Sequence, residues 1–99
     1  MPNKLVELHD EASVEYDAAF DWYLDRSAEA AVKFDAEAAR ALAEIGKAPQ
    51  RWAVGSHHTR RFLLRQFPFV LIYRECDVDV LVLAVAHTSR KPGYWKLRI

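Results

Sequence analysis

The chain has 99 residues, of which 52% are apolar and 28% charged, and its acidic and basic side chains balance to a net charge of zero. This composition is that of one folded domain over residues 1–99 and excludes a disordered chain. The longest apolar run, residues 80–86, is too short for a membrane helix, and the N-terminus lacks a secretion signal. A single cysteine, Cys76, excludes an internal disulfide. We therefore expect a cytoplasmic protein.

The zero net charge conceals an asymmetry between the two halves of the chain. Residues 1–48 hold five Lys and Arg against eleven Asp and Glu, and residues 49–99 hold nine against three. The second half is expected to form a basic region that meets nucleic acid or an acidic protein. The plainer interpretation is that opposite charges help the two halves to pack.

The N-terminal half predicts one short strand followed by two helices. The strand covers residues 4–8, KLVEL, and Asp10 is the expected N-cap of the first helix, which breaks off at Arg26-Ser27. Its apolar positions recur at spacings of three and four, at Ala12, Tyr16, Ala19, Phe20, Tyr23 and Leu24. The acidic residues on the opposite side are Asp17, Asp21 and Asp25.

Ser27 is the expected cap of a second helix, which Gly46 and Pro49 bring to an end. Its apolar face consists of Ala31, Phe34, Ala38, Leu42 and Ile45. Because the link between the helices is short, we expect an antiparallel hairpin. The aromatic residues lie at helical spacing, which indicates core rather than a cofactor site: Tyr16, Phe20, Tyr23 and Phe34.

From residue 59 the apolar period changes from about 3.6 residues to about 2, which is typical of strands. The strands are expected at residues 59–66, 69–75 and 80–86, with turns at residues 67–68 and 77–79. Short links predict an antiparallel meander, and the last strand is apolar on both faces, so it should be central and covered by the hairpin. With strand 4–8 this gives an α+β fold of order β-α-α-β-β-β, with an antiparallel four-stranded sheet.

Basic and aromatic side chains accumulate on the strands and after the last one. The residues concerned are Arg61, Arg65, Arg74, His87, Arg90, Lys91, Tyr94 and Trp95. Arginine suits phosphate or carboxylate, the aromatic rings suit stacking on bases, and His87 is the candidate proton-transfer group. The plainer interpretation is a set of solvated arginines. The adjacent His57 and His58 lack further ligands nearby, so we predict neither a metal site nor a cofactor.

Two stretches, FPFVLIYRE (67–75) and VLAVAHTSRKPGYWKLR (82–98), resemble the C-terminal signature of the RelE/ParE superfamily, the toxins of bacterial type II toxin–antitoxin systems. The segments AFDWYLDRS and RRFLLRQFPF agree with it, so the resemblance covers nearly the whole chain. It implies the β-α-α-β-β-β fold and a cognate antitoxin that lays a C-terminal helix and an extended segment over the toxin. It leaves a homodimer and a toxin–antitoxin hetero-oligomer open.

RelE-like members cleave mRNA on the ribosome without a metal. On that alternative the resemblance assigns Arg65 and Arg74 to the phosphate, His87 or Tyr94 to proton transfer, and Arg90 to RNA positioning. Residues 59–66, however, contain no glutamate that would serve as the base.

ParE-like members, which stabilise plasmids, bind DNA gyrase and lack a nuclease site. The motif AHTSRKPGYW with the preceding FPF resembles the ParE branch more closely, and this is the function we favour. The residues expected to contact the target or the antitoxin are Arg61, Arg65, Arg90, Lys91, Trp95, Lys96 and Arg98. A non-toxic protein-interaction module is a third alternative.

Overall fold

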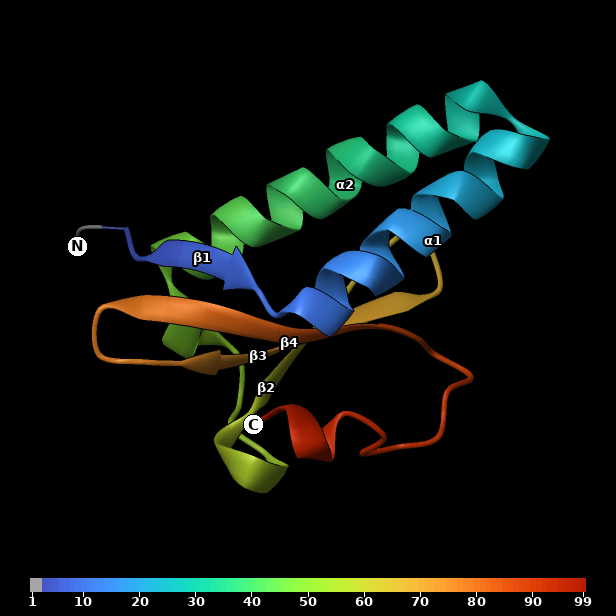
Figure 1. The fold of residues 1–99 in the computed structure, drawn as a ribbon. Coiled ribbons are helices and arrows are strands. Elements are labelled where there is room, and N and C mark those ends of the chain that lie inside the picture. Colours follow the sequence, from blue (N-terminus) through green and yellow to red (C-terminus); the bar gives the residue numbers. More distant parts are fainter. Residues whose placement is uncertain (1–2) are drawn as a thin grey trace.

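The computed structural model, which describes residues 3–99, places a helical hairpin on one face of a four-stranded sheet (Figure 1). Its elements are β1 (Leu5–Leu8), α1 (Asp10–Arg26), α2 (Ala28–Lys47), β2 (Arg60–Leu63), β3 (Phe69–Glu75) and β4 (Asp79–His87). Short 3-10 helices lie at Pro49–Arg51, Ser56–His58 and Lys96–Arg98. The predicted α+β fold and order of elements are confirmed. No helix within the described residues is long and apolar enough to cross a membrane.

The sheet is mixed, which corrects the prediction of a purely antiparallel one. The strand order is β1-β4-β3-β2, with β2, β3 and β4 forming the expected antiparallel meander. β1 instead pairs in parallel with β4, from Leu5 opposite Asp79 to Leu8 opposite Val82. A parallel pair needs a long crossover connection, and the hairpin with the first two meander strands supplies it.

The first helix begins with a different cap from the one predicted. His9, not Asp10, is the N-cap, and its Nδ1 accepts a hydrogen bond from the Glu11 N–H at 3.0 Å. The His9 N–H donates to the Val82 carbonyl at 2.8 Å, so the extended conformation of β1 continues to His9. Asp10 and Glu11 consequently lie in the first turn, where acidic side chains favour the helix.

Gly46 lies inside α2 rather than just beyond its end. Its carbonyl accepts a hydrogen bond from the Lys4 N–H at 3.0 Å, and a Cβ at this position would lie 3.0 Å from the Lys4 carbonyl oxygen. The glycine therefore lets the last turn of α2 approach the chain before β1 closely. The cap at Ser27 is confirmed, because its Oγ accepts from the Ala30 N–H at 3.2 Å.

β2 is shorter than predicted and ends at Leu63. Glu37 of α2 accepts hydrogen bonds from the N–H groups of Arg65 and Gln66, so these amides bond to the helix and not to a strand. Leu64 is still buried, as the alternation predicts. The Glu37 side chain therefore joins the helical hairpin to the turn before β3.

Both faces of the central strands are covered, as predicted for β4. On the helix side, the buried ring of Phe34 lies 5.3–5.5 Å from the rings of Tyr16, Tyr23, Phe67 and Phe69. This confirms the aromatic residues as core. The opposite face consists of Val70, Ile72, Leu83, Ala84 and Ala86, all buried. Trp95 covers it from the C-terminal segment, defined here as residues 88–99, which crosses below the sheet in Figure 1.

Candidate functional site

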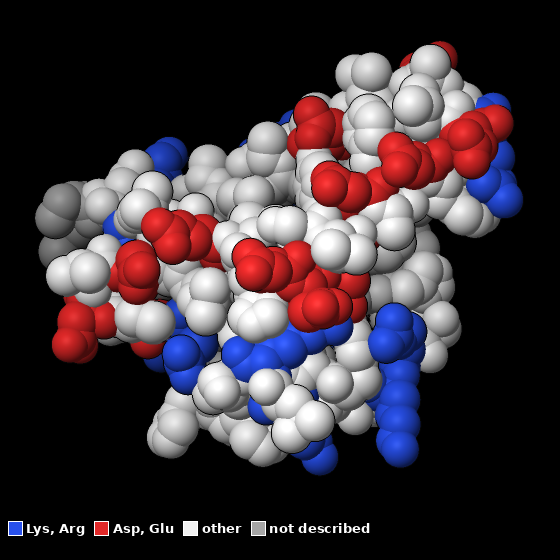
Figure 2. Space-filling model, in the orientation of Figure 1, with Lys and Arg blue, Asp and Glu red and all other residues white. Residues whose placement is uncertain are grey.

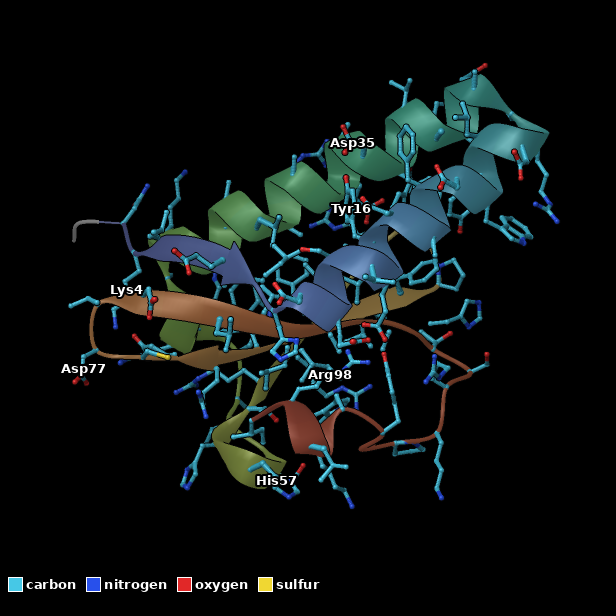
Figure 3. All side chains as sticks on the ribbon, viewed as in Figure 1. Lys4, Tyr16, Asp35, His57, Asp77 and Arg98 are labelled. Atoms are coloured by element: carbon cyan, nitrogen blue, oxygen red, sulfur yellow. The ribbon has the colours of Figure 1, made fainter. Side chains whose placement is uncertain are left out.

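One carboxylate, that of Glu15 on α1, holds the C-terminal segment in place. It accepts two hydrogen bonds from Arg98, at 2.9 and 3.0 Å, and one from the Tyr94 hydroxyl at 2.6 Å. Glu15 and Arg98 are only 15% and 14% exposed, and Arg98 points from the segment toward the sheet and α1 (Figure 3). The contact joins residues 83 positions apart in the sequence.

The same pair closes an open edge of the sheet. β1 pairs with β4 only as far as Val82. Beyond that point the Val85 N–H donates to Glu15 at 3.0 Å, and Arg98 donates to the Leu83 carbonyl at 3.0 Å. Side chains thus satisfy backbone groups that a further strand would otherwise bind.

The hydrogen bonds decide the protonation of this cluster. Burial opposes the charge of Glu15, but the bonds from Arg98, Tyr94 and the Val85 N–H hold its pKa below the usual 4.5. Burial and the bond to Glu15 raise the pKa of Tyr94 to about 12. The hydrogen bond to Glu15 is also the main reason that the pKa of Arg98 is raised. Glu15 is therefore charged at neutral pH, and Tyr94 is a neutral hydrogen-bond donor.

A groove of about 420 Å³ lies beside this cluster, between α1 and the end of β4. We call it the α1–β4 groove. It is lined by Glu15, Ala18, Ala19, Trp22, Tyr23, Pro68, Phe69, Val85, His87 and Arg90. Its surface is mostly apolar, and the Trp22 side chain is 52% exposed at its rim. Apolar walls with a few polar groups are typical of a binding site.

The structure does not bring the four candidate catalytic residues together. His87 packs edge-on against Phe69 on the helix side of the sheet, with ring centroids 5.3 Å apart. Arg74 follows Val70 and Ile72 at a spacing of two along β3. It therefore lies with them on the face of the sheet away from the helices. It also lies five residues beyond Phe69 along β3, a separation of about 16 Å.

Of the other two members of that set, Tyr94 lines the same small hollow as His87, and Arg65 lies elsewhere. Arg65 lines grooves beside α2 with Glu37 and Arg40. Tyr94 is bound to Glu15, and its raised pKa makes it a poor proton donor near neutral pH. The arrangement predicted for a nuclease, with arginines and a proton-transfer group around one phosphate, is therefore not present among these four residues.

The candidate binding residues divide into exposed and supporting side chains. Arg61, Arg90 and Lys91 line a small hollow of about 140 Å³ on the face of the sheet that the C-terminal segment covers. They and Lys96 are exposed, whereas Arg65 lies apart from them beside α2. Trp95, predicted as a contact residue, is only 5% exposed because it packs on the sheet. The Arg98 guanidinium is bound to Glu15. Trp95 and Arg98 therefore hold the C-terminal segment against the rest of the protein.

Glu15 and Trp22 are the site residues that sequence reasoning missed. Glu15 is one of six acidic residues of α1, but it follows buried Ala12 by three residues and precedes buried Ala19 by four. This spacing in the sequence places Glu15 on the buried face of the helix, and it could have identified Glu15 as a site residue. Trp22 gave a weaker signal, as a large aromatic residue on an acidic helix. Within residues 3–99, no three His, Cys, Asp or Glu side chains gather to hold a metal ion.

Comparison with known proteins agrees with the fold. The family model described as the ParE toxin of the type II toxin–antitoxin system, parDE, matches residues 6–92. Among solved structures, the fold is similar to a chain of the chromosomal ParDE TA system from P. aeruginosa. The TM-score is 0.69 at 16% identity, over 88% of this chain and 98% of that chain. No curated protein matches the sequence.

Proposed function

Because the chain belongs to the ParE toxin family of type II toxin–antitoxin systems, we propose that it arrests growth by binding DNA gyrase in the cytoplasm and that a cognate antitoxin neutralises it. The family match confirms the predicted ParE-like branch of the superfamily and makes an antitoxin the expected partner. The cations proposed to contact the target are Arg61, Arg90, Lys91 and Lys96. They are exposed and lie on or beside the C-terminal segment.

The observation that favours gyrase binding over mRNA cleavage is the dispersal of the candidate catalytic residues. A nuclease site must hold the proton-transfer group and the phosphate-binding arginine within a few ångströms of the reacting atoms. His87 and Arg74 lie on opposite faces of the sheet. A toxin that binds its target needs no such convergence.

The test is a comparison of gyrase activity and mRNA integrity after induction in a bacterial host. We expect purified protein to inhibit supercoiling and transcripts to remain uncut. His87→Ala should leave growth arrest largely intact, whereas a variant with Arg90→Gln and Lys91→Gln should weaken it. Cut transcripts in a translating extract that disappear with His87→Ala would instead establish the nuclease function.

We place the antitoxin in the α1–β4 groove, and the state of the sheet edge favours a helix there over a strand. A strand added to β4 would need the Leu83 carbonyl and the Val85 N–H, and both already have side-chain partners. The apolar lining and exposed Trp22 suit the apolar face of an amphipathic helix instead. The groove is large enough for a few anchoring side chains.

Truncation of the exposed tryptophan tests this placement. Trp22→Ala should weaken antitoxin binding by about 30-fold or more, because a buried aromatic anchor contributes about 2 kcal/mol or more. Val78→Ala is the matched control, since Val78 is an 82% exposed apolar residue in the β3–β4 turn, away from the groove. Calorimetric titration with the antitoxin measures both. Equal affinity of the two variants would place the antitoxin elsewhere.

A further inference from the structure

We propose that the α1–β4 groove selects a bipolar helix, with basic residues along the flank that faces α1 and acidic residues along the flank that faces His87 and Arg90. The inference rests on the proposed docking of the antitoxin in this groove. It adds the chemistry that the docked segment must have. The basis is that the two walls of the groove carry opposite charge.

The α1 wall is acidic. Asp21 and Asp25 follow the groove-lining residues Ala18 and Trp22 by three positions, so each lies beside one of them on the helix surface. Both carboxylates are exposed, and neither takes part in the ion pairs found among residues 3–99. Figure 2 shows acidic side chains in a row along α1. A segment seated against Ala18 and Trp22 therefore meets free negative charge.

The single cation of α1 offsets only part of this charge. Arg26 lies at the C-terminal end of the helix and donates to the Trp22 carbonyl at 2.9 Å. Its guanidinium lies over the Trp22 ring, 3.6 Å from the centroid. Glu15, also on this wall, is neutralised by Arg98. Two carboxylates, Asp21 and Asp25, against one guanidinium leave this wall with a net negative charge.

The opposite wall is basic. His87 and Arg90 line the groove where β4 gives way to the C-terminal segment, and Lys91 follows. The Arg90 guanidinium lies over the Tyr94 ring, 3.8 Å from its centroid, and has no carboxylate within 4.0 Å among the described residues. Figure 2 shows basic side chains below the acidic row. A uniformly acidic segment would suit this wall and be repelled by α1.

Three synthetic helical peptides of about 15 residues test the inference. They share apolar anchors at i, i+3, i+4 and i+7 and differ in their flanks: Lys on one and Glu on the other, Glu on both, or Lys on both. Binding to the full chain is measured by tryptophan fluorescence at low and physiological salt. An exposed charge pair changes affinity by about two- to fivefold, so we expect the bipolar peptide to bind about 10-fold tighter than either other peptide. The preference should shrink as salt is added.

Variants of each wall show which charges are responsible. The double substitution Asp21→Asn and Asp25→Asn should remove the advantage of the bipolar peptide over the peptide with Glu on both flanks. Arg90→Gln should remove its advantage over the peptide with Lys on both flanks. Asp77→Asn is the control, because this exposed acid lies in the β3–β4 turn (Figure 3), whereas His87 is the last residue of β4, at the opposite end of that strand. It should change neither preference.

The outcomes separate this inference from the proposed function. Equal binding of all three peptides, with an affinity in calorimetric titration that Trp22→Ala lowers, would overturn the charge pattern and leave the docking site in place. If no peptide binds and Trp22→Ala leaves the affinity for the antitoxin unchanged, both the docking site and the charge pattern are overturned.

Discussion

Replacing Glu15 by alanine removes the one side chain that joins α1, the edge of β4 and the C-terminal segment. The substitution deletes the acceptor of four hydrogen bonds, from Arg98, Tyr94 and the Val85 N–H. It also leaves the Arg98 guanidinium, 14% exposed, without its counter-charge. Only its bond to the Leu83 carbonyl remains.

The expected cost follows from this geometry. Breaking a fully buried ion pair by removing one partner costs about 3–5 kcal/mol and an exposed pair about 0–1 kcal/mol, and this pair, 14–15% exposed, lies nearer the buried limit. A domain of this size has a total stability of about 5–15 kcal/mol. Glu15→Ala should therefore lower the free energy of unfolding by about 2–4 kcal/mol. Replacing Arg98 by methionine in the same chain should recover part of the loss, since no buried charge is then left unpaired.

Urea denaturation measures the free energy, and native-state hydrogen exchange locates the effect. The Val85 amide donates to Glu15, so it should lose protection in Glu15→Ala even under conditions where the domain is folded. Asp21→Asn is the matched control, because Asp21 is an exposed acid in the middle of the same helix. Its effect should be below about 0.5 kcal/mol.

The result that would refute this reasoning is a loss below about 1 kcal/mol in Glu15→Ala with unchanged protection of the Val85 amide. The C-terminal segment would then be held by the packing of Trp95 alone.

Three further predictions concern pH and packing. Because the pKa of Glu15 is lowered in the folded protein, the unfolded chain binds a proton first as the pH falls. The contribution of Glu15 to the free energy of unfolding should therefore be fully present above about pH 4.5 and decline below it. Urea midpoints from pH 7 to pH 3 should show a weaker decline in Glu15→Gln. Tyr73→Phe should lose about 1–2 kcal/mol in urea denaturation, since the buried hydroxyl donates to the Pro49 carbonyl at 2.6 Å. Tyr23→Phe removes no hydrogen bond found among residues 3–99 and should cost less. Gly46→Ala should lower the thermal midpoint, because the added Cβ would press on the backbone before β1. This effect should outweigh the preference of helices for alanine over glycine, about 1 kcal/mol. A raised midpoint would show that the chain before β1 can move away.

The order of elements and most of the core were readable from the sequence because they depend on local periodicity. Apolar spacing of three and four identified the hairpin, and alternation identified the meander. Ser27 was recognised as a cap because its bond to Ala30 spans only three residues. His9 was not, since what holds it extended is its bond to Val82, a residue far along the chain.

The candidate site was only partly predictable. His87 and Arg90 were predicted as site residues by type and position, and both line the α1–β4 groove. The grouping of His87 with Arg74 was not supported, because alternation along β3 puts Arg74 on the other face of the sheet. Trp95 was expected on a contact surface and is buried, since the sheet's second face needs a cover.

The sequence by itself determined the fold class, the helical and strand segments and the resemblance to a toxin superfamily, all of which are properties of neighbouring residues and short motifs. The tertiary structure alone decided the parallel pairing of β1 with β4, the pairing of Glu15 with Arg98 across 83 positions, and the opposite charges of the two groove walls. The physical reason is distance along the chain. A pattern with a period of a few residues records which side of an element is buried, but not which distant element covers it.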